Sequence, residues 1–463
     1  MTEPLKTKIS KVPQKTNSNH IKGEFQVKKL ACLWLTLLMV LSIALTGCNK
    51  SVKTSDTPDK KEKVTIKFWA VGNDANPDDL TAKWLKETVQ KFEDKNPNIK
   101  VDYTPVANGD EYLTKISTEM AANNAPDVFY CWVAERLKPF VKAGRVLPLN
   151  DIIEGDAEFK SVLNTGLLEP STFDGKVYAI PNEIAGEVIY YNKELFTKYN
   201  VKVPETWNEL LTAIKTFKEN GITPFSLANK DSWIGTIPYM YIFDRLHGPD
   251  KYKEVMINHE AKFNDSAYIE AAKRLVELRD AGAYPNNFNS LGSAEGEALF
   301  KTGKAAMSLQ GTWNLATNEK NLGDKLGVIN FPDIEGGKGS KQEDWIVFPN
   351  STYSISNNTK HKDEAAKLLK FIFSKERQAA YANIGALVAT KNIPVDASKL
   401  NPITVELNKK LTSAKYPEIA WDILIGQNLG KELNLATQQI LGGADIKDTF
   451  NKLNKLAEQE WKK

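Results

Sequence analysis

Segments with strand periodicity and segments with helix periodicity alternate from residue 64 onward, and this alternation restricts the fold more than any other feature. Val64–Trp69 alternates apolar and polar residues as a strand does, and apolar residues at helical spacing follow between Leu80 and Phe92. A strand at Ile99–Thr104, a helix at Glu111–Ala122 and a strand at Asp127–Tyr130 come next. Alternating strands and helices of this length predict an α/β fold, with a parallel sheet covered by helices on both faces.

The loops that follow these strands carry candidate binding residues, because ligands of parallel sheets sit beyond the carboxyl ends of the strands. The loop after the first strand offers Asn73 and Asp74, and the loop after the third offers Trp132, Glu135 and Arg136. Aromatic rings stack on the C–H faces of a sugar, while amide, carboxylate and guanidinium groups hydrogen-bond its hydroxyls. This mixture of residue types favours a carbohydrate site.

Two further segments hold short motifs in a characteristic order. Gly175–Pro181, Tyr190–Lys193 and Pro204–Trp207 form the first group, and Gly303–Trp313, with the sequence GKAAMSLQGTW, forms the second. The chain thereby resembles the family 1 extracellular solute-binding proteins, the maltose-binding-protein-like receptors of carbohydrate ABC transporters. A third match covers Ser351–Gln378, where the glycine pair common in the family is replaced. Together the matches span about 400 residues.

Local structure is also expected within residues 175–207. We expect strands at Val177–Ile180 and Val188–Tyr191, with the first ending at the proline that follows it. The polar segment Asn182–Glu187 between them is interpreted as a hinge loop. Asn192 and Thr206 are expected to cap the two helices that follow.

The resemblance implies a two-lobed periplasmic-binding-protein-like fold, in which each lobe is a mainly parallel sheet flanked by helices and the lobes are joined by hinge crossovers. Rotation at crossings near Asn182, Asn350 and Pro394 would close the cleft between them. The expected organisation is a signal peptide at 1–47, a flexible tether at 48–63, lobe 1 at 64–181 and 353–394, and lobe 2 at 182–352 and 395–463.

Further binding candidates lie in segments that the resemblance places at the cleft. Gly311 and Trp313 end the second motif, where the family binds ligand. The expected hinge loop offers two carboxylates, and aromatic residues of the second lobe offer stacking surfaces. These additional candidates are Glu183, Glu187, Trp233, Tyr416 and Trp421.

The N-terminus reads as a secretory leader. A lysine-containing region is followed by the apolar run Leu30–Thr46 and by Leu45–Cys48, which matches the bacterial lipoprotein box. Cys48 would then be the lipidated first residue, and the protein would be anchored on the outer face of the cytoplasmic membrane. An uncleaved anchor helix is the alternative, because about 17 apolar residues nearly span a bilayer.

Composition argues against several other classes of protein. Residues 1–47 hold seven lysines and two glutamates, so their removal changes the formal charge from +3 to −2, which gives no indication of nucleic-acid binding. Cys131 would remain as a single cysteine, interpreted as a buried, unreactive thiol. We expect no metal and no cofactor, because the four histidines are scattered and no metal-binding or G-x-S-x-G motif occurs.

The sequence therefore predicts an extracellular receptor rather than an enzyme. It would bind a sugar, with an oligosaccharide favoured, act as a monomer, and deliver the sugar to the membrane subunits of an ABC importer. The main alternative is a secreted glycoside hydrolase in which Glu135 pairs with Glu183 or Glu187. An adhesive surface lipoprotein is a third interpretation.

Overall fold

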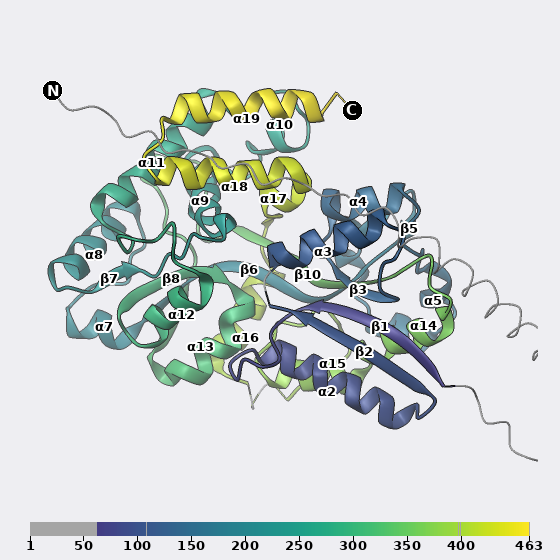
Figure 1. The fold of residues 1–463 in the computed structure, drawn as a ribbon. Coiled ribbons are helices and arrows are strands. Elements are labelled where there is room, and N and C mark those ends of the chain that lie inside the picture. Colours follow the sequence, from purple (N-terminus) through teal and green to yellow (C-terminus); the bar gives the residue numbers. More distant parts are fainter. Residues whose placement is uncertain (1–62, 108, 397, 399, 463) are drawn as a thin grey trace, which may run out of the picture. The chain divides into compact units, whose positions relative to one another are not determined.

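Two long antiparallel strands, β6 (Ile180–Asn192) and β10 (Asp344–Ile355), connect the two halves of the sheet (Figure 1). The computed structural model describes residues 63–107, 109–396, 398 and 400–462. The predicted signal peptide, the predicted lipidation site Cys48 and nearly all of the expected tether lie outside the described residues. The strand order is β2-β1-β3-β10-β6-β8-β7, with β11 paired to β10 and β9 paired to β6. The remaining strands are β1 (Val64–Val71), β2 (Ile99–Val106), β3 (Val128–Cys131), β4 (Thr172–Phe173), β5 (Lys176–Val177), β7 (Thr223–Phe225), β8 (Ala305–Gly311), β9 (Leu326–Ile329) and β11 (Tyr416–Glu418).

The parallel sheet predicted from the first strands is confirmed. Strand β1 lies between β2 and β3 and is parallel to both. Helix α2 (Leu80–Lys95) covers one face of these strands and α3 (Gly109–Ala121) covers the other (Figure 1). In the other half, β7 and β8 are parallel, whereas β6 and β10 run antiparallel to their neighbours β8 and β3.

The prediction of a hinge loop at Asn182–Glu187 is wrong, because the chain forms one unbroken strand from Ile180 to Asn192. Pro181 does not end the strand; it is the second residue of β6 and lies opposite Thr352 of β10. The polar side chains that suggested a loop are buried, and those of Asn182 and Glu183 accept hydrogen bonds: Asn182 accepts a bond of 2.7 Å from Gln378 Nε2. Buried polar groups with partners are compatible with a strand interior.

A first hydrophobic core packs around β1, β2 and β3. It includes Phe68, Leu85 and Ile116 from the N-terminal third, together with Tyr353 and Leu368 from a much later part of the chain. The helices around it are α2, α3, α4 (Ala134–Lys142), α5 (Asn150–Glu154), α6 (Ala157–Val162), α14 (Lys362–Ile372) and α15 (Lys375–Asn383), with the 3-10 helices η1 (Thr165–Leu167) and η2 (Glu169–Ser171).

A second and larger core packs around β7 and β8 and includes Trp207, Phe243 and Trp421. The C-terminal helix α19 (Ile446–Glu460) buries Phe450 and Leu453; it lies against α18 (Gln427–Leu441) (Figure 1). The other elements of this half are α7 (Lys193–Lys198), α8 (Trp207–Glu219), α9 (Thr236–His247), α10 (Lys253–Met256), α11 (Ser266–Ala281), α12 (Ser293–Lys301), α13 (Leu315–Leu322), α16 (Pro402–Thr412), α17 (Trp421–Leu424), η3 (Ser232–Gly235), η4 (Thr312–Asn314) and η5 (Gly323–Lys325).

Both predicted helix caps are confirmed. The Asn192 side chain accepts hydrogen bonds from the backbone N–H groups of Glu194 and Leu195 at 3.0 and 3.3 Å, so α7 begins directly after β6. Thr206 accepts from the N–H of Glu209 at 3.4 Å at the start of α8. These bonds satisfy backbone donors that have no partner within the helix.

A third segment of chain runs beside the two long strands. Ile184 N–H donates to the carbonyl of Leu387 at 2.7 Å, and Ala389 N–H donates to that of Asn182 at 3.1 Å. The connection thus contacts β6 before the chain reaches Pro394. Within the described part of the chain, none of the helices is both long and apolar enough to cross a bilayer.

Candidate functional site

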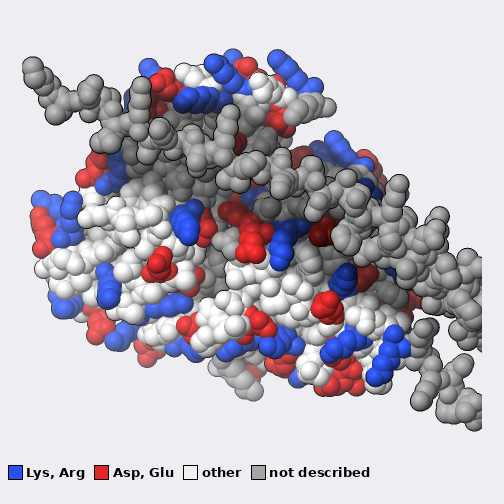
Figure 2. Space-filling view, in the orientation of Figure 1, with Lys and Arg blue, Asp and Glu red and all other residues white. Residues whose placement is uncertain are grey.

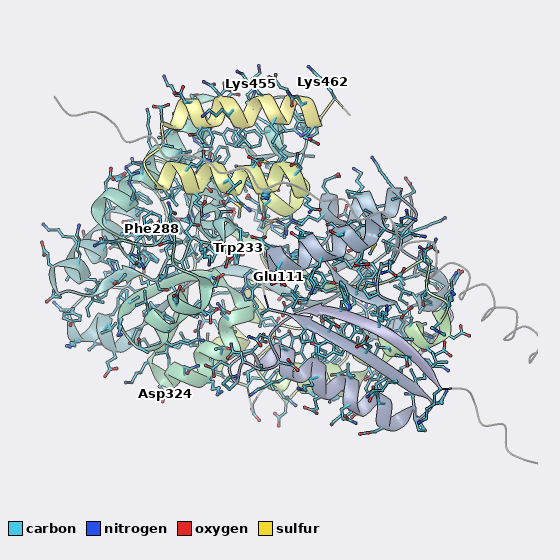
Figure 3. All side chains as sticks on the ribbon, in the orientation of Figure 1. Glu111, Trp233, Phe288, Asp324, Lys455 and Lys462 are labelled. Carbon is cyan, nitrogen blue, oxygen red and sulfur yellow. The ribbon has the colours of Figure 1, made fainter. Side chains whose placement is uncertain are left out.

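A cavity of about 370 Å³ lies between the elements of the two cores. Residues from the loops directly after β1, β2, β3 and β8 line it, which is the edge of the sheet that the sequence predicted. The other walls come from β6, β10, α12 and α17. Trp233 lines the cavity together with the first residues of α3, and Figure 3 marks it near the start of that helix.

Three half-buried tryptophans line the cavity, together with the buried rings of Tyr130 and Phe348. Trp132 follows β3, whereas Trp233 and Trp313 come from the other half of the molecule. The rings of Trp233 and Trp313 are 5.8 Å apart and inclined by 59°, so they do not stack on each other. Trp132 packs edge-on against Tyr130 at 4.9 Å. Tryptophans that are only half-buried in a cavity leave ring surface for a ligand.

Glu183 is a buried carboxylate at the point where the two long strands meet. Its Oε1 atom accepts hydrogen bonds from Asn350 Nδ2 at 2.8 Å and Ser351 Oγ at 2.7 Å, and its Oε2 atom accepts from the Tyr381 hydroxyl at 2.9 Å. Burial raises the pKa of Glu183, and these three donors oppose that rise. The predicted candidate is thus in the wall, with its carboxylate fixed by β10 and α15.

Ser351 explains a departure of the sequence from the family pattern. This residue and Asn350 stand where a glycine pair is common, and Ser351 has a φ of 49°, in the left-handed region that glycine adopts most readily. The Ser351 hydroxyl bonds to Glu183, so the side chain gives a contact that glycine lacks. Such a bond offsets the cost of the conformation.

Glu187 is four residues further along β6 and is only 2 % exposed. Among the residues that the structure describes, no side chain or backbone group hydrogen-bonds its buried Oε2 atom. Burial, with a smaller contribution from the negative charge of Asp422, raises the pKa of Glu187 to about 8. The backbone carbonyl of Glu187 accepts a bond of 2.5 Å from the Tyr241 hydroxyl, which fixes the strand at this point.

Arg136 lines the cavity, but its guanidinium group is engaged by the protein. Arg136 Nη2 lies 2.7 Å from Asp422 Oδ2, and Arg136 Nε donates to the Asp422 carbonyl at 3.3 Å. The Arg136 guanidinium also lies 5.0 Å from the centre of the Trp132 ring. At a second point on the rim, Lys320 Nζ lies 2.9 Å from Asp78 Oδ1. The first ion pair joins α4 to α17, and the second joins the loop after β1 to α13.

Four other predicted candidates are outside the lining of the cavity. The Asp74 carboxylate forms an ion pair with Lys86 at 2.8 Å, and the Asn73 side chain accepts from the N–H of Ala75. Glu135 pairs with Lys138 on the same helix at 2.5 Å. The Gly311 carbonyl accepts from the Tyr190 hydroxyl at 3.1 Å.

Gly311, predicted as a ligand-binding residue, lies against the ring of Trp313. A Cβ atom there would lie 2.2 Å from the ring of Trp313. Glycine is therefore required because the indole lies on the backbone, and Gly311 positions the tryptophan.

Trp421 does not line the cavity, so the prediction that it offers a stacking surface to the ligand is wrong. Its side chain is 0 % exposed and packs edge-on against Tyr239 and Phe243 in the second core. Its Nε1 donates to Glu418. The neighbouring residues Ala420, Asp422 and Ile423 line the cavity instead. For Tyr416 the structure describes only the backbone, which belongs to β11 and pairs with Asp344.

Several polar residues of the wall were missed by the sequence reasoning. Asp110 lies in the segment after β2, at the carboxyl end of a parallel strand, where ligand-binding residues are expected. Asp231 precedes Trp233 by two residues, and its carboxylate accepts a hydrogen bond of 2.7 Å from Ser293 Oγ. No spacing distinguishes these aspartates from those of solvent-exposed loops. The acidic residues of the wall are Asp78, Asp79, Asp110, Glu183, Glu187, Asp231, Glu297 and Asp422, and the basic ones are Arg136 and Lys301. Figure 2 shows Asp and Glu side chains gathered near the centre of this face.

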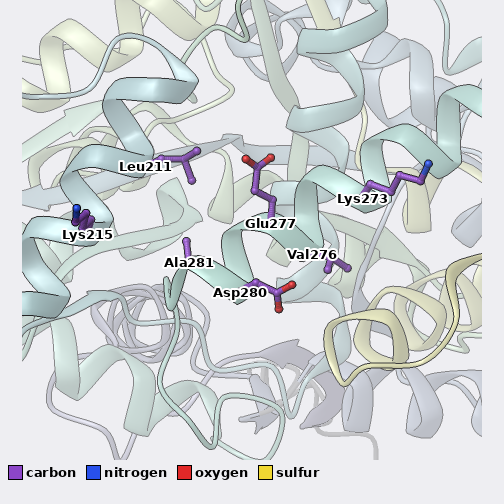
Figure 4. Close-up of a pocket in the computed structure, with 7 residues that line it drawn as sticks. All are labelled: Leu211, Lys215, Lys273, Val276, Glu277, Asp280 and Ala281. Carbon is purple, nitrogen blue, oxygen red and sulfur yellow. The ribbon is translucent and has the colours of Figure 1, made fainter.

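A second hollow lies far from these residues, between α8 and α11 (Figure 4). Its volume is about 590 Å³, and none of the described residues that line it is a tryptophan or a tyrosine. Lys215 in its wall has a side chain that is 76 % exposed, and Glu277 pairs with Arg274 at 2.8 Å. Exposed charges without converging partners do not make a ligand site, so we place function in the cavity between the cores.

Comparison with known proteins identifies the family. Residues 76–379 match the model of the bacterial extracellular solute-binding proteins, and the chain belongs to this family. An ABC transporter extracellular-binding protein of Pyrococcus horikoshii is 27% identical over 443 residues, covering 90% of this chain and 93% of that protein. The multiple sugar-binding protein of Streptococcus mutans is 28% identical over 378 residues, covering 80% and 85%.

Solved structures give the same result. A structure described under xylan utilization by Caldanaerobius polysaccharolyticus superimposes with a TM-score of 0.78 at 33% identity, covering 84% of this chain and 99% of that one. The predicted family, the two-lobed fold with hinge crossovers and the prediction of a binding receptor instead of an enzyme are confirmed. The glycoside hydrolase alternative finds no support in these similarities.

Proposed function

We propose that this protein binds an oligosaccharide in the cavity between its lobes and delivers it to an ABC importer. The observation that carries the proposal is the set of three half-buried tryptophans in one acidic cavity, contributed by both halves of the molecule. Relatives named as sugar-binding and ABC transporter proteins support the same function. We retain residues 64–181 with 353–394 as lobe 1, and 182–352 with 395–463 as lobe 2.

In this proposal, sugar rings stack on Trp132 from lobe 1 and on Trp233 and Trp313 from lobe 2. Carboxylates and amides of the wall, Asp110 and Asn314 among them, receive and donate the hydroxyl hydrogen bonds. A ligand that contacts both lobes at once favours the closed form over the open one. A few stacked rings with several hydrogen bonds are enough for micromolar affinity, about −8 kcal/mol.

The N-terminus is proposed to hold the receptor at the cell surface. Diacylglycerol on Cys48 would anchor the chain to the outer face of the cytoplasmic membrane, with residues up to about 63 as a tether. Cys48→Ser should release the protein into the culture medium without changing its sugar affinity. Retention of this variant in the membrane fraction would favour an uncleaved anchor helix. We expect a monomer, to be checked by light scattering.

The test of the binding function is thermal unfolding of residues 62–463, which form a compact unit of their own, against a panel of mono- and oligosaccharides. A higher melting temperature with a few related sugars, recovered intact, supports a transport receptor. Cleaved sugar would point to a hydrolase, and no shift across a broad panel would contradict carbohydrate binding.

A tryptophan substitution tests the position of the site. Trp313→Ala should weaken binding about tenfold or more, because it removes a stacking surface, and should leave the melting temperature of the empty protein nearly unchanged. Trp461→Ala is the matched control, because Trp461 is also half-buried but stacks on His259, outside the cavity. Equal affinity of wild type and Trp313→Ala would refute the placement.

A further inference from the structure

We propose that the cavity selects sugars that carry a positively charged amino group, and that the Glu187 carboxylate recognises this group. The inference rests on the proposed sugar-binding function and names the chemical class of the ligand. It distinguishes amino sugars from neutral sugars and from uronic acids.

The charge of the wall is the first observation. Acidic side chains outnumber basic ones, and each basic side chain in the wall is already paired: Arg136 with Asp422 at 2.7 Å and Lys301 with Glu297 at 3.0 Å. At the rim, Lys320 is paired with Asp78. No cation of the described wall therefore remains to bind a ligand carboxylate. A uronic acid would meet excess negative charge, whereas an ammonium group would be attracted.

The second observation is the contrast between two glutamates on one strand. Glu183 and Glu187 are four residues apart on β6, so their side chains point to the same face of the sheet. Three donors satisfy the Glu183 carboxylate, whereas the buried Oε2 atom of Glu187 has no partner among the described groups. A buried polar atom without a partner is costly, and it is therefore an indication of a missing ligand.

An ammonium group supplies what Glu187 lacks. It brings three hydrogen-bond donors and a positive charge, and charge-assisted bonds are the stronger kind. A neutral hydroxyl would supply one weaker donor. The tryptophans of the same cavity also attract cations to their ring faces, so stacking and charge recognition favour the same ligand.

The charged and titratable groups around Glu187 give the inference an independent measurement. Glu187 interacts electrostatically with Asp422 of α17, which is paired with Arg136 of α4, and with the tyrosines Tyr190 and Tyr241. Because burial and Asp422 raise the pKa of Glu187 to about 8, the empty site carries a proton at pH 6.5. An ammonium ligand lowers this pKa, so its binding should release close to one proton.

The experiment compares disaccharides that share a β-1,4 linkage. Glucosamine disaccharide, N-acetylglucosamine disaccharide and cellobiose differ chiefly at C2, and cellobiouronic acid, which has the same linkage, supplies a negative charge. Calorimetry of residues 62–463 at pH 6.5, in two buffers of different ionisation enthalpy, gives both affinity and proton release. We expect the glucosamine disaccharide to bind about tenfold or more tightly than cellobiose, with proton release for the amine alone.

Two variants test whether Glu187 causes the preference for the amine and the proton release. Glu187→Gln should bring the amine and neutral sugars to similar affinity and abolish proton release. Glu277→Gln, on α11 outside the cavity, should retain the wild-type preference. If Glu187→Gln unfolds, the proton release of the wild type decides alone.

Three results would overturn the inference while leaving the sugar receptor standing. They are binding of neutral sugars without preference for the amine, binding of the uronic acid as tightly as the amine, and an amine preference that persists in Glu187→Gln. Absence of binding by every saccharide would instead refute the proposed function together with this inference.

Discussion

We propose that the ion pair between Arg136 and Asp422 forms only in the closed form of the receptor and therefore contributes to ligand affinity. The side chains are 10% and 13% exposed and 2.7 Å apart, so solvent screens them little. Asn434 Nδ2 also donates to Asp422 Oδ2 at 3.0 Å, so the carboxylate keeps one partner when Arg136 is removed. We expect the pair to favour closure by about 2 kcal/mol, which is about 30-fold in the dissociation constant.

A double-mutant cycle measures this contribution. Arg136→Gln, Asp422→Asn and the double variant are titrated with the saccharide that raises the melting temperature most, and unfolding free energies are measured in denaturant without ligand. The coupling should appear in the binding free energies. If it is below about 0.5 kcal/mol in binding and instead appears in full in unfolding, the pair is a permanent part of the fold and not a contact of the closed form.

Two further predictions concern buried titratable groups. The pKa of Glu187 is raised to about 8 in the folded protein, so the stability that its proton provides is present below the unfolded value near 4.5 and is lost as pH rises through 8. The unfolding free energy of the empty protein, measured in urea, should therefore fall by about 5 kcal/mol over this range, and Glu187→Gln should flatten this pH dependence; an unchanged pH dependence in the variant would refute this cause. Burial raises the pKa of Cys131 to about 12, so a thiol reagent at pH 8 should label this residue only after denaturation, and rapid labelling of the native protein would contradict its burial.

Local periodicity was enough to predict the first half of the fold. The strands β1 to β3 and the helices between them follow from apolar spacing within short windows, and the caps Asn192 and Thr206 depend on neighbours two or three residues away. Each of these features is decided by adjacent residues, which a sequence displays directly.

The errors arose where distant residues decide the outcome. Segment 182–187 is polar but forms a strand, because Glu183 receives hydrogen bonds from residues 167 to 198 positions later in the chain. Arg136 was expected to bind ligand, yet its guanidinium is paired with Asp422, 286 positions away. Trp233 and Trp421 are both tryptophans of the second half of the chain, and both were predicted to bind ligand. Only tertiary packing places Trp233 in the cavity wall and Trp421 in the core.

The path of the chain through β6 and β10 determines the order in which the protein can be completed. The first core includes buried residues between Ile66 and Ile180, together with Tyr353, Ile355 and buried residues of the helices that follow them. About 170 residues of the other half are therefore synthesised before the first core has all its strands. Contacts of such long separation slow folding and keep the N-terminal segment from closing a core alone. A chain that cannot finish folding until most of it has been made also stays extended for longer, and an extended chain is the form that a secretion channel can thread.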